Sequence, residues 1–425
     1  MSSTTRDSAT VTVVGATRVP LRLPTAGATF VVGVAGYLGV NLSPYLILAV
    51  QQGLGADVLT ASWLVTGALL LTALTGLAVA PLCAGRSRRA VARVGLGLAV
   101  VGFGLAAVAP VLLLPGLLLG GVGAGGAVAT SGAAIAAFRN PDRVAGFYGL
   151  ANRGIVTIVL AVVPLIGLAP IDVFGSMAVF CLVALVLATW LPGAPAAPVH
   201  AAAAAGAAVP LEIPPTGTLR AAARPSRVVT VAGFTLLLVF ALWAASEDSL
   251  WAMVGVMGAD RTGLAPEGLG VALSGATAGG LLASIGLMIV GDRLGRGIPL
   301  FVLLVLGGIL KIVQGTITDP TAFVVVFVLW NTVYALAFAF FIATSAALDA
   351  DGRWSGPLLA TYLVGSALTP VIGANLVSGL GYGGFTVTLA IASFVLAVPA
   401  GVIGLVSRRL ERDAAQERPN EGASA

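Results

Sequence analysis

Long apolar stretches, separated by short polar ones, run along the chain from end to end. A helix that crosses the hydrocarbon core of a bilayer needs about 20 apolar residues, and about twelve stretches have that length. Because unpaired backbone groups cannot face lipid, we expect each stretch to be a helix. The expected spans are 27–50, 59–83, 94–110, 112–137, 147–169, 171–191, 228–257, 268–290, 298–317, 321–346, 356–378 and 384–406.

The segment from Gly193 to Pro225 interrupts this pattern between the sixth and seventh stretches. Its proline, alanine and glycine content predicts a flexible linker, with a surface amphipathic helix as the alternative. We therefore expect an N-terminal tail (1–26), a six-helix bundle (27–192), a linker (193–227), a second six-helix bundle (228–407) and a C-terminal tail (408–425).

The composition supports the fold class that the pattern predicts. Hydrophobic residues make up 58% of the chain, charged residues only 9%, and the mean hydropathy is +1.04. These values lie far outside the range of soluble globular domains. The chain is predicted to be an all-α polytopic membrane protein with about twelve transmembrane helices.

The arginines predict the orientation, because cytoplasmic loops keep Lys and Arg during insertion. They occur in both tails, in the linker and in alternate loops, whereas Arg261 alone occurs in a loop on the other side. We expect a multi-pass protein of the cytoplasmic membrane with both termini in the cytoplasm. The net charge of +5 then reflects topology and anionic lipid headgroups, and no nucleic-acid partner is expected.

Residues for catalysis or metal binding are scarce. Cys83 and Cys181 fall at or within spans, and the single histidine, His200, lies in the linker. Neither a disulfide framework, nor a metal site, nor Ser-His or Cys-His catalysis is predicted, and no cofactor is expected. The run "GGVGAGGAV" formally contains G-x-G-x-x-G, but apolar helix surrounds it, so it predicts close helix packing.

The two halves of the chain repeat one another. The loop "AGRSRRA" aligns with "GDRLGRG", so that Arg86 matches Arg293 and Arg89 matches Arg296, each after the second span of its half. In the same way "PLIG" in the fifth span matches "PVIG" in the eleventh. Parallel six-plus-six repeats are known from transporters, whose solute sites lie between the halves near the midplane.

The loop "GDRLGRG" resembles the signature loop of the major facilitator superfamily, which lies between helices two and three and again between eight and nine. The residues that fit in the second half are Gly291, Asp292, Arg293, Gly295 and Arg296, whereas the first half keeps only Arg86 and Arg89 and has Gly85 in place of the aspartate. The resemblance implies two pseudo-symmetric six-helix bundles, alternating access, and a cytoplasmic latch at these loops. The alternative is that these charges only set the orientation.

Charges inside the spans are more informative, because an ionised group at the bilayer centre costs at least about 2.5 kcal/mol. Arg153, beside Asn152, is expected near mid-depth, or on a helix that extends into the cytoplasm. Glu247 and Asp248 point about 100° apart on the seventh helix, so we expect one of them to face the cavity, unless both are interfacial. The resemblance adds that the first and seventh helices line the cavity.

Other polar residues give weaker signals. Lys311 is expected to extend toward the outer interface beside Asp319. Uncharged polar side chains within spans line a solute path or serve as contacts between helices; they are Tyr37, Asn41, Gln51, Asn331, Tyr334, Tyr362 and Asn375.

The sequence thus predicts a monomeric secondary transporter, rather than an enzyme, that moves a small organic solute by alternating access with proton coupling. Export of a drug or metabolite is the first expectation; uptake by symport or facilitated passage is the alternative, and a membrane receptor is less favoured. Two departures weaken export within the family resemblance. The start of the fourth span, "PVLLLPGLLLGG", lacks the arginine of many proton-coupled exporters, and their Gly-Pro motif survives only as Pro164 and Gly167.

Overall fold

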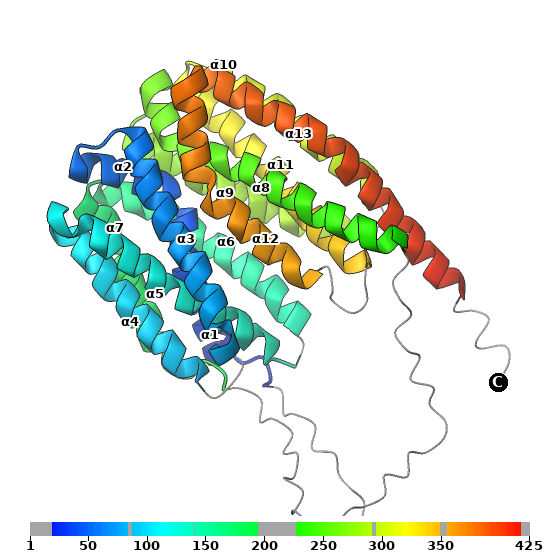
Figure 1. Ribbon diagram of the computed structural model, residues 1–425, viewed down its shortest axis with the longest axis horizontal. Helices are drawn as coiled ribbons and strands as arrows, with labels where there is room; N and C mark the ends of the chain where they lie inside the picture. Colours follow the sequence, from blue (N-terminus) through cyan, green and yellow to red (C-terminus); the bar gives the residue numbers. More distant parts are fainter. Residues whose placement is uncertain are drawn as a thin grey trace, which may run out of the picture.

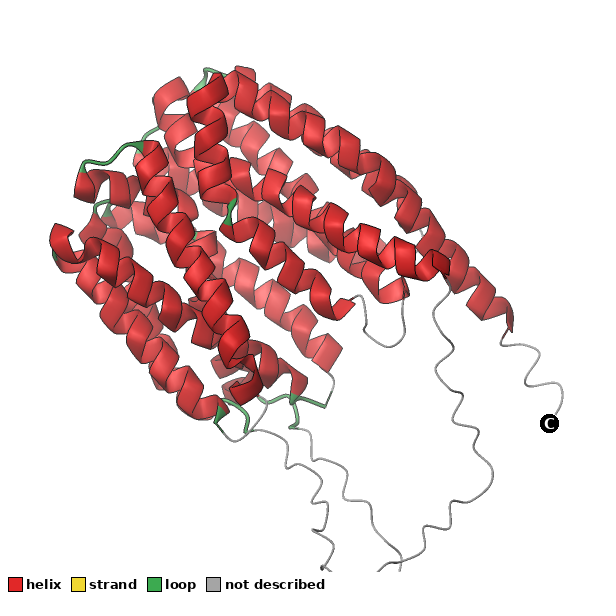
Figure 2. Cartoon of the chain, viewed as in Figure 1, coloured by secondary structure: helices red, strands yellow, loops and turns green. Residues whose placement is uncertain are grey.

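The computed structural model describes residues 19–83, 87–139, 141–193, 227–290, 295–348 and 355–417, and nearly all of them are helical (Figures 1 and 2). The helices are α1 (Leu23–Asn41), α2 (Ser43–Leu54), α3 (Val58–Cys83), α4 (Arg88–Val108), α5 (Pro110–Ala136), α6 (Pro141–Ile166), α7 (Pro170–Leu187), the 3₁₀ turn η1 (Ala188–Trp190), α8 (Arg227–Thr262), α9 (Pro266–Val290), α10 (Gly297–Thr316), α11 (Pro320–Leu348), α12 (Ser355–Ala367) and α13 (Thr369–Glu417).

The number of spans agrees with the sequence prediction. In the described part of the chain, eleven helices are long and apolar enough to cross a membrane. The first span is α1 continued by α2, with a break at Leu42 that Pro44 explains, because proline cannot donate the helical hydrogen bond. The eleventh is α12 continued into α13, and Gly381, at φ 66°, separates it from the twelfth. The prediction of about twelve transmembrane helices is confirmed.

The helices form two bundles that follow the two halves of the chain. In the first half α4 and α3 pack on α5, and α4 on α7; in the second half α13 packs on α10 and α8, and α11 on α9. Figure 1 shows the blue-to-green helices on one side and the green-to-red helices on the other. The ends of η1 and α8 that adjoin residues 194–226 mark what we call the linker end of the bundles; the opposite end is the far end.

The two halves meet at mid-depth and toward the far end. Across the interface α6 packs on α9, α2 on α8, and α3 on α13. Thr157 of α6 donates a hydrogen bond to Thr277 of α9 (2.8 Å), and Trp251 of α8 donates to the backbone carbonyl of Asn41 at the α1–α2 break (3.2 Å). The segment 246–258 of α8 is buried on every side, so the far part of this helix is enclosed by both halves.

The glycine-rich run in the fourth span packs α5 against α4, as the sequence predicts. A β-carbon on Gly123 would overlap the backbone of Gly95 and Ala99. Only glycine allows the two helix backbones to approach this closely.

We expect Gly123→Ala to destabilise the first bundle by roughly 1–3 kcal/mol, because the added carbon meets backbone that cannot rotate away. Gly132→Ala on the same helix is the matched control, since nothing lies within 4 Å of that position. Thermal unfolding in detergent measures both variants. Equal melting temperatures for the two would contradict the packing argument.

Candidate functional site

Glu247 and Lys311 form a buried ion pair inside the second half. Lys311 Nζ lies 2.8 Å from Glu247 Oε1, and the two side chains are 3% and 0% exposed. Nζ also donates to the Ser246 and Ser393 hydroxyls at 2.9 and 2.8 Å, so all three of its protons have acceptors. The expectation that Lys311 reaches the outer interface beside Asp319 is therefore wrong: the side chain points into its own bundle, where a carboxylate compensates it.

The Glu247–Lys311 pair joins four helices. Glu247 Oε2 accepts a hydrogen bond of 2.7 Å from the Trp330 indole of α11, so α8, α10, α11 and α13 all contribute a side chain to this network. Both carboxylate oxygens and the whole ammonium group have partners. The ion pair is thus neutral and fully hydrogen-bonded, and it holds the middle of α8 in one orientation.

Asp248, the next residue along α8, has a different environment. It is only 7% exposed, yet its Oδ2 has no hydrogen-bond partner. The hydroxyls nearest to it belong to Tyr334 of α11, and to Tyr362 and Ser366 of α12. Because successive helical residues point about 100° apart, the fixed position of Glu247 turns Asp248 to another face.

Arg153 lies halfway along α6, in the first half, and its guanidinium extends toward the second half. A β-carbon on Gly280 of α9 would lie 2.5 Å from Arg153 Nη1 and 2.9 Å from the Ala335 β-carbon. Asp248, Tyr334 and Tyr362 lie within electrostatic range of Arg153. No ion pair joins Arg153 to any residue in the described part of the chain. Opposite charges from the two halves thus face one interface without forming a salt bridge.

Several other polar side-chain atoms within the spans are buried and have no partner in the described part of the chain. The atoms are Asn41 Nδ2, Tyr148 Oη, Asn152 Oδ1, Asn331 Oδ1 and Ser366 Oγ. Buried polar atoms normally have hydrogen-bond partners, so each of these atoms is a candidate contact for water or a solute. Asn41, Asn152 and Asn331 were candidates from the sequence, and Tyr37, another candidate, lies within electrostatic range of Tyr148.

Sequence reasoning missed Tyr148 and Ser366. A helical-face argument would have found both, because Tyr148 precedes Asn152 by one helical turn and Ser366 follows Tyr362 by one turn. The other candidate, Tyr334, bonds through its hydroxyl to that of Tyr362 at 3.1 Å.

Aromatic rings form a continuous surface behind the two tyrosines. Tyr334 stacks on Trp243 with ring centroids 5.1 Å apart, and Phe338 meets Tyr362 edge to face at 5.3 Å. Phe240 packs against Tyr362 at 5.8 Å. We call these five residues the aromatic wall. It belongs entirely to the second half and is continuous with the hydroxyls beside Asp248.

Much of the predicted latch lies outside the described residues, namely Gly291, Asp292, Arg293 and Arg86. Gly295 has φ 65°, a left-handed conformation that favours glycine, and the guanidinium of Arg408 lies against it. Arg296 directly precedes α10. The second-half loop therefore touches the end of its own bundle at Arg408.

In the first half the loop arginines bind the end of the sixth span. Arg89 donates to the Leu191 carbonyl at 2.9 Å, and Arg88 donates to the carbonyls of Pro192 and Gly193, each at 3.2 Å. Arg88, which aligns with Gly295 when the loop "AGRSRRA" is placed against "GDRLGRG", is buried. These contacts fix the point at which the chain leaves the first bundle.

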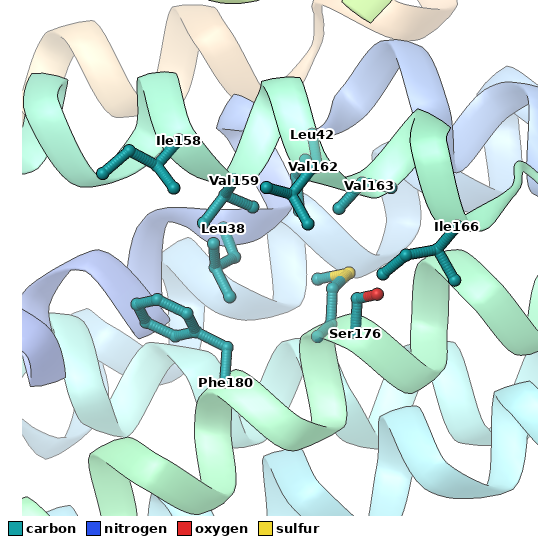
Figure 3. A pocket seen from close by; sticks show the side chains of 10 residues that line it. Leu38, Leu42, Ile158, Val159, Val162, Val163, Ile166, Ser176 and Phe180 are labelled. Atoms are coloured by element: carbon teal, nitrogen blue, oxygen red, sulfur yellow. The ribbon is translucent and has the colours of Figure 1, made fainter. Parts of the chain in front are cut away.

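Two cavities lie away from this site. One, of about 170 Å³, opens between α1, α6 and α7 and is lined by apolar side chains with Ser176 as the polar exception (Figure 3). The other, of about 570 Å³, lies at the far end between the halves, where Gln51 and Gln52 of α2 face Asp260 of α8. Neither contains Arg153 or Asp248. In the described part of the chain, no group of three or more His, Cys, Asp or Glu side chains could hold a metal ion.

Comparison with known proteins identifies the fold and the family. The chain is similar in structure to a peptide transporter, POT, in complex with sulfate (16% identity, TM-score 0.68, covering 93% of this chain and 97% of that one). It is also similar to a D-xylose-proton symporter (15%, 0.65, 88% and 96%) and to a POT family transporter in complex with 5-aminolevulinic acid (13%, 0.65, 91% and 96%). No curated protein matches. The sequence profile of the Major Facilitator Superfamily matches residues 26–351, and the chain therefore belongs to that superfamily of secondary transporters.

Proposed function

We propose that the protein is a proton-coupled transporter of a small organic solute, whose site lies between the two halves around Arg153 and Asp248. One observation carries the proposal: Asp248 is buried with an unpartnered carboxylate oxygen, while the adjacent Glu247 is fully paired. An ionised carboxylate is costly to bury without a partner, and taking up a proton removes that charge.

This contrast selects Asp248 rather than Glu247 as the proton carrier. Protonation of Glu247 would leave the Lys311 ammonium buried without its counter-charge, which is strongly unfavourable. Asp248 forms no ion pair in the described part of the chain, so its protonation leaves no buried cation without a counter-charge. It also faces Arg153, which belongs to the opposite half, so the charges around it change whenever the halves move relative to each other.

Alternating access would use the contacts that the halves make toward the far end. In this conformation Trp251 and Thr157 each bond across the interface. We propose that the linker end is cytoplasmic, as the arginine distribution predicts. The loop from Gly291 to Arg296, with Arg86 and Arg89, would then act at the cytoplasmic side. Export by antiport and uptake by symport use the same site; they differ in whether proton and solute occupy it in turn or together.

The test is solute-driven proton movement in proteoliposomes that enclose a pH-sensitive dye. We expect Asp248→Asn to abolish proton movement, while exchange of labelled solute across the membrane persists, because the shape of the site is kept and only the titrating group is lost. Glu267→Gln, at an exposed carboxylate of α9, is the matched control and should move protons like the parent. Full proton movement by Asp248→Asn would refute the proposal.

A further inference from the structure

The buried charges of the interface determine which solute could cross together with a proton. At mid-depth the described residues carry four charges: Glu247, Asp248 and Lys311, which are buried, and Arg153, which is half-buried. Glu247 and Lys311 cancel within one bundle. What remains between the halves is one positive charge on Arg153 and one negative charge on Asp248.

We infer that the site takes one monovalent organic anion with a flat apolar body together with one proton, so that the carrier is electrically neutral both when empty and when fully loaded. The inference rests on the proposed function and deepens it, because it names the charge of the solute, its shape and the stoichiometry. It makes the protein an electroneutral symporter and gives up the expectation of export by antiport.

The argument follows the net charge through the cycle. Empty, the site holds Arg153 and ionised Asp248 and is neutral. A proton alone leaves it with one positive charge, and an anion alone leaves it with one negative charge. Proton and anion together restore neutrality. An occluded site excludes water, so a net charge inside it is costly, and only the two neutral states change sides easily. Transport of the anion is then coupled to transport of the proton by charge neutrality alone.

Other solute charges do not give this result. A cation that exchanges with the proton would leave one net positive charge in both forms. A zwitterion would be neutral without the proton and positive with it, which would uncouple the two. A monovalent anion is therefore the charge class that can bind between Arg153 and Asp248 and that requires a proton for the loaded site to be neutral.

The groups around Asp248 fit this role. Arg153 of α6, Tyr334 of α11 and Tyr362 of α12 face it, Glu247 lies beside it on α8, and Lys311 of α10 lies behind Glu247. Tyr334 and Tyr362 are neutral, and α13 contributes neutral groups to the network, the Ser393 hydroxyl and the Leu389 carbonyl. In the described part of the chain, Asp248 is thus the one group of this set that can change its charge without breaking an ion pair.

The same surroundings suit an anion with a ring. Arg153 presents a fork of N–H donors with no carboxylate on it, which matches a carboxylate or sulfonate. The hydroxyl of Ser366, beside Asp248, and that of Tyr148 on α6 have no partner in the described part of the chain. In the aromatic wall, Tyr334, Phe338 and Tyr362 are partly exposed and offer ring faces on which a planar apolar body can stack, while Phe240 and Trp243 support them from the core.

Three phenyl compounds with fixed charge test the solute class: benzenesulfonate, neutral benzenesulfonamide and benzyltrimethylammonium. Binding is measured by thermal stabilisation of the purified protein at pH 5.5 and pH 8. We expect benzenesulfonate to bind at least roughly tenfold tighter than the other two compounds. It should also bind more tightly at pH 5.5 than at pH 8, because a proton on Asp248 accompanies the anion. The charge of benzenesulfonate itself does not change between these pH values. Preference for the cation, no discrimination, or no binding by any of them overturns the inference.

Proteoliposomes test the stoichiometry. With the membrane potential set by potassium and valinomycin, benzenesulfonate uptake should carry protons inward at a rate that does not depend on the potential. A rate that changes severalfold with the potential overturns electroneutrality. Movement of protons against benzyltrimethylammonium would overturn the inference and leave the proposed function standing. If benzenesulfonate is taken up without protons, the inference fails. If Asp248→Asn also moves protons like the parent with a solute that does drive them, the proposed function fails as well.

Discussion

Lys311→Met is expected to lower the free energy of unfolding by about 3–5 kcal/mol, the effect of removing one member of a buried ion pair. Methionine keeps the length of the side chain but leaves the Glu247 carboxylate buried without its counter-charge. The hydroxyls of Ser246 and Ser393 lose their common donor at the same time. We expect the second bundle to loosen where α8, α10 and α13 meet.

The buried thiols of Cys83 and Cys181 provide the measurement. A dye that becomes fluorescent on reaction with thiols reports unfolding as temperature rises, because neither cysteine is accessible in the folded protein. Glu247→Gln with Lys311→Met in one chain is the decisive control, since the double variant has no unpaired charge. It should recover most of the lost stability. If the single variant melts like the parent, the pair does not support the bundle.

The sequence predicted the spans well because the signal for a span is local. A run of about 20 apolar residues must be a helix in lipid, whatever packs beside it. The predicted seventh span, 228–257, and the observed α8, Arg227–Thr262, differ by a few residues at the far end. There the helix continues past Gly258 through the exposed residues Ala259 and Asp260, and hydropathy does not report a polar helix end.

Side-chain direction was the part that the sequence could not supply. Lys311 lies late in an apolar run, where extension to the interface is the ordinary outcome for lysine. The structure shows instead a carboxylate, two serines and an indole from three other helices around one position. Which of Glu247 and Asp248 faces the interface depends on that arrangement. Only the packing of α8 against α10, α11 and α13 decides it.

The two sets of charges at mid-depth are placed differently relative to the interface between the halves. Glu247 and Lys311 are saturated and lie within one bundle, so they stay together whether the halves are apart or closed. Asp248 and Arg153 belong to opposite halves and carry no direct salt bridge. The protonation of a carboxylate that is already paired within one bundle does not depend on how the two halves are placed. The electrostatic environment of a carboxylate changes with that placement when the opposite charge belongs to the other half.

The final prediction concerns that second set. Arg153→Gln is expected to weaken benzenesulfonate binding by roughly 30-fold or more, because the sulfonate loses its positively charged partner, and truncating one member of such a charge pair costs about 2–5 kcal/mol. Arg227→Gln, at the exposed start of α8, is the matched control and should bind like the parent. Thermal stabilisation at a series of ligand concentrations gives both dissociation constants.

Arg153→Gln with Asp248→Asn in one chain separates charge from shape. This double variant removes both interface charges but keeps hydrogen-bonding amides at both positions, so its empty site is neutral, as the parent's is. A neutral solute should then fit best, and we expect the preference to pass from benzenesulfonate to benzenesulfonamide, with no dependence on pH between 5.5 and 8. The aromatic wall is untouched by either change and should still hold the ring. If the double variant kept the parent's preference for the sulfonate, the anion would be bound elsewhere, and Arg153 and Asp248 would contribute only to contact between the halves.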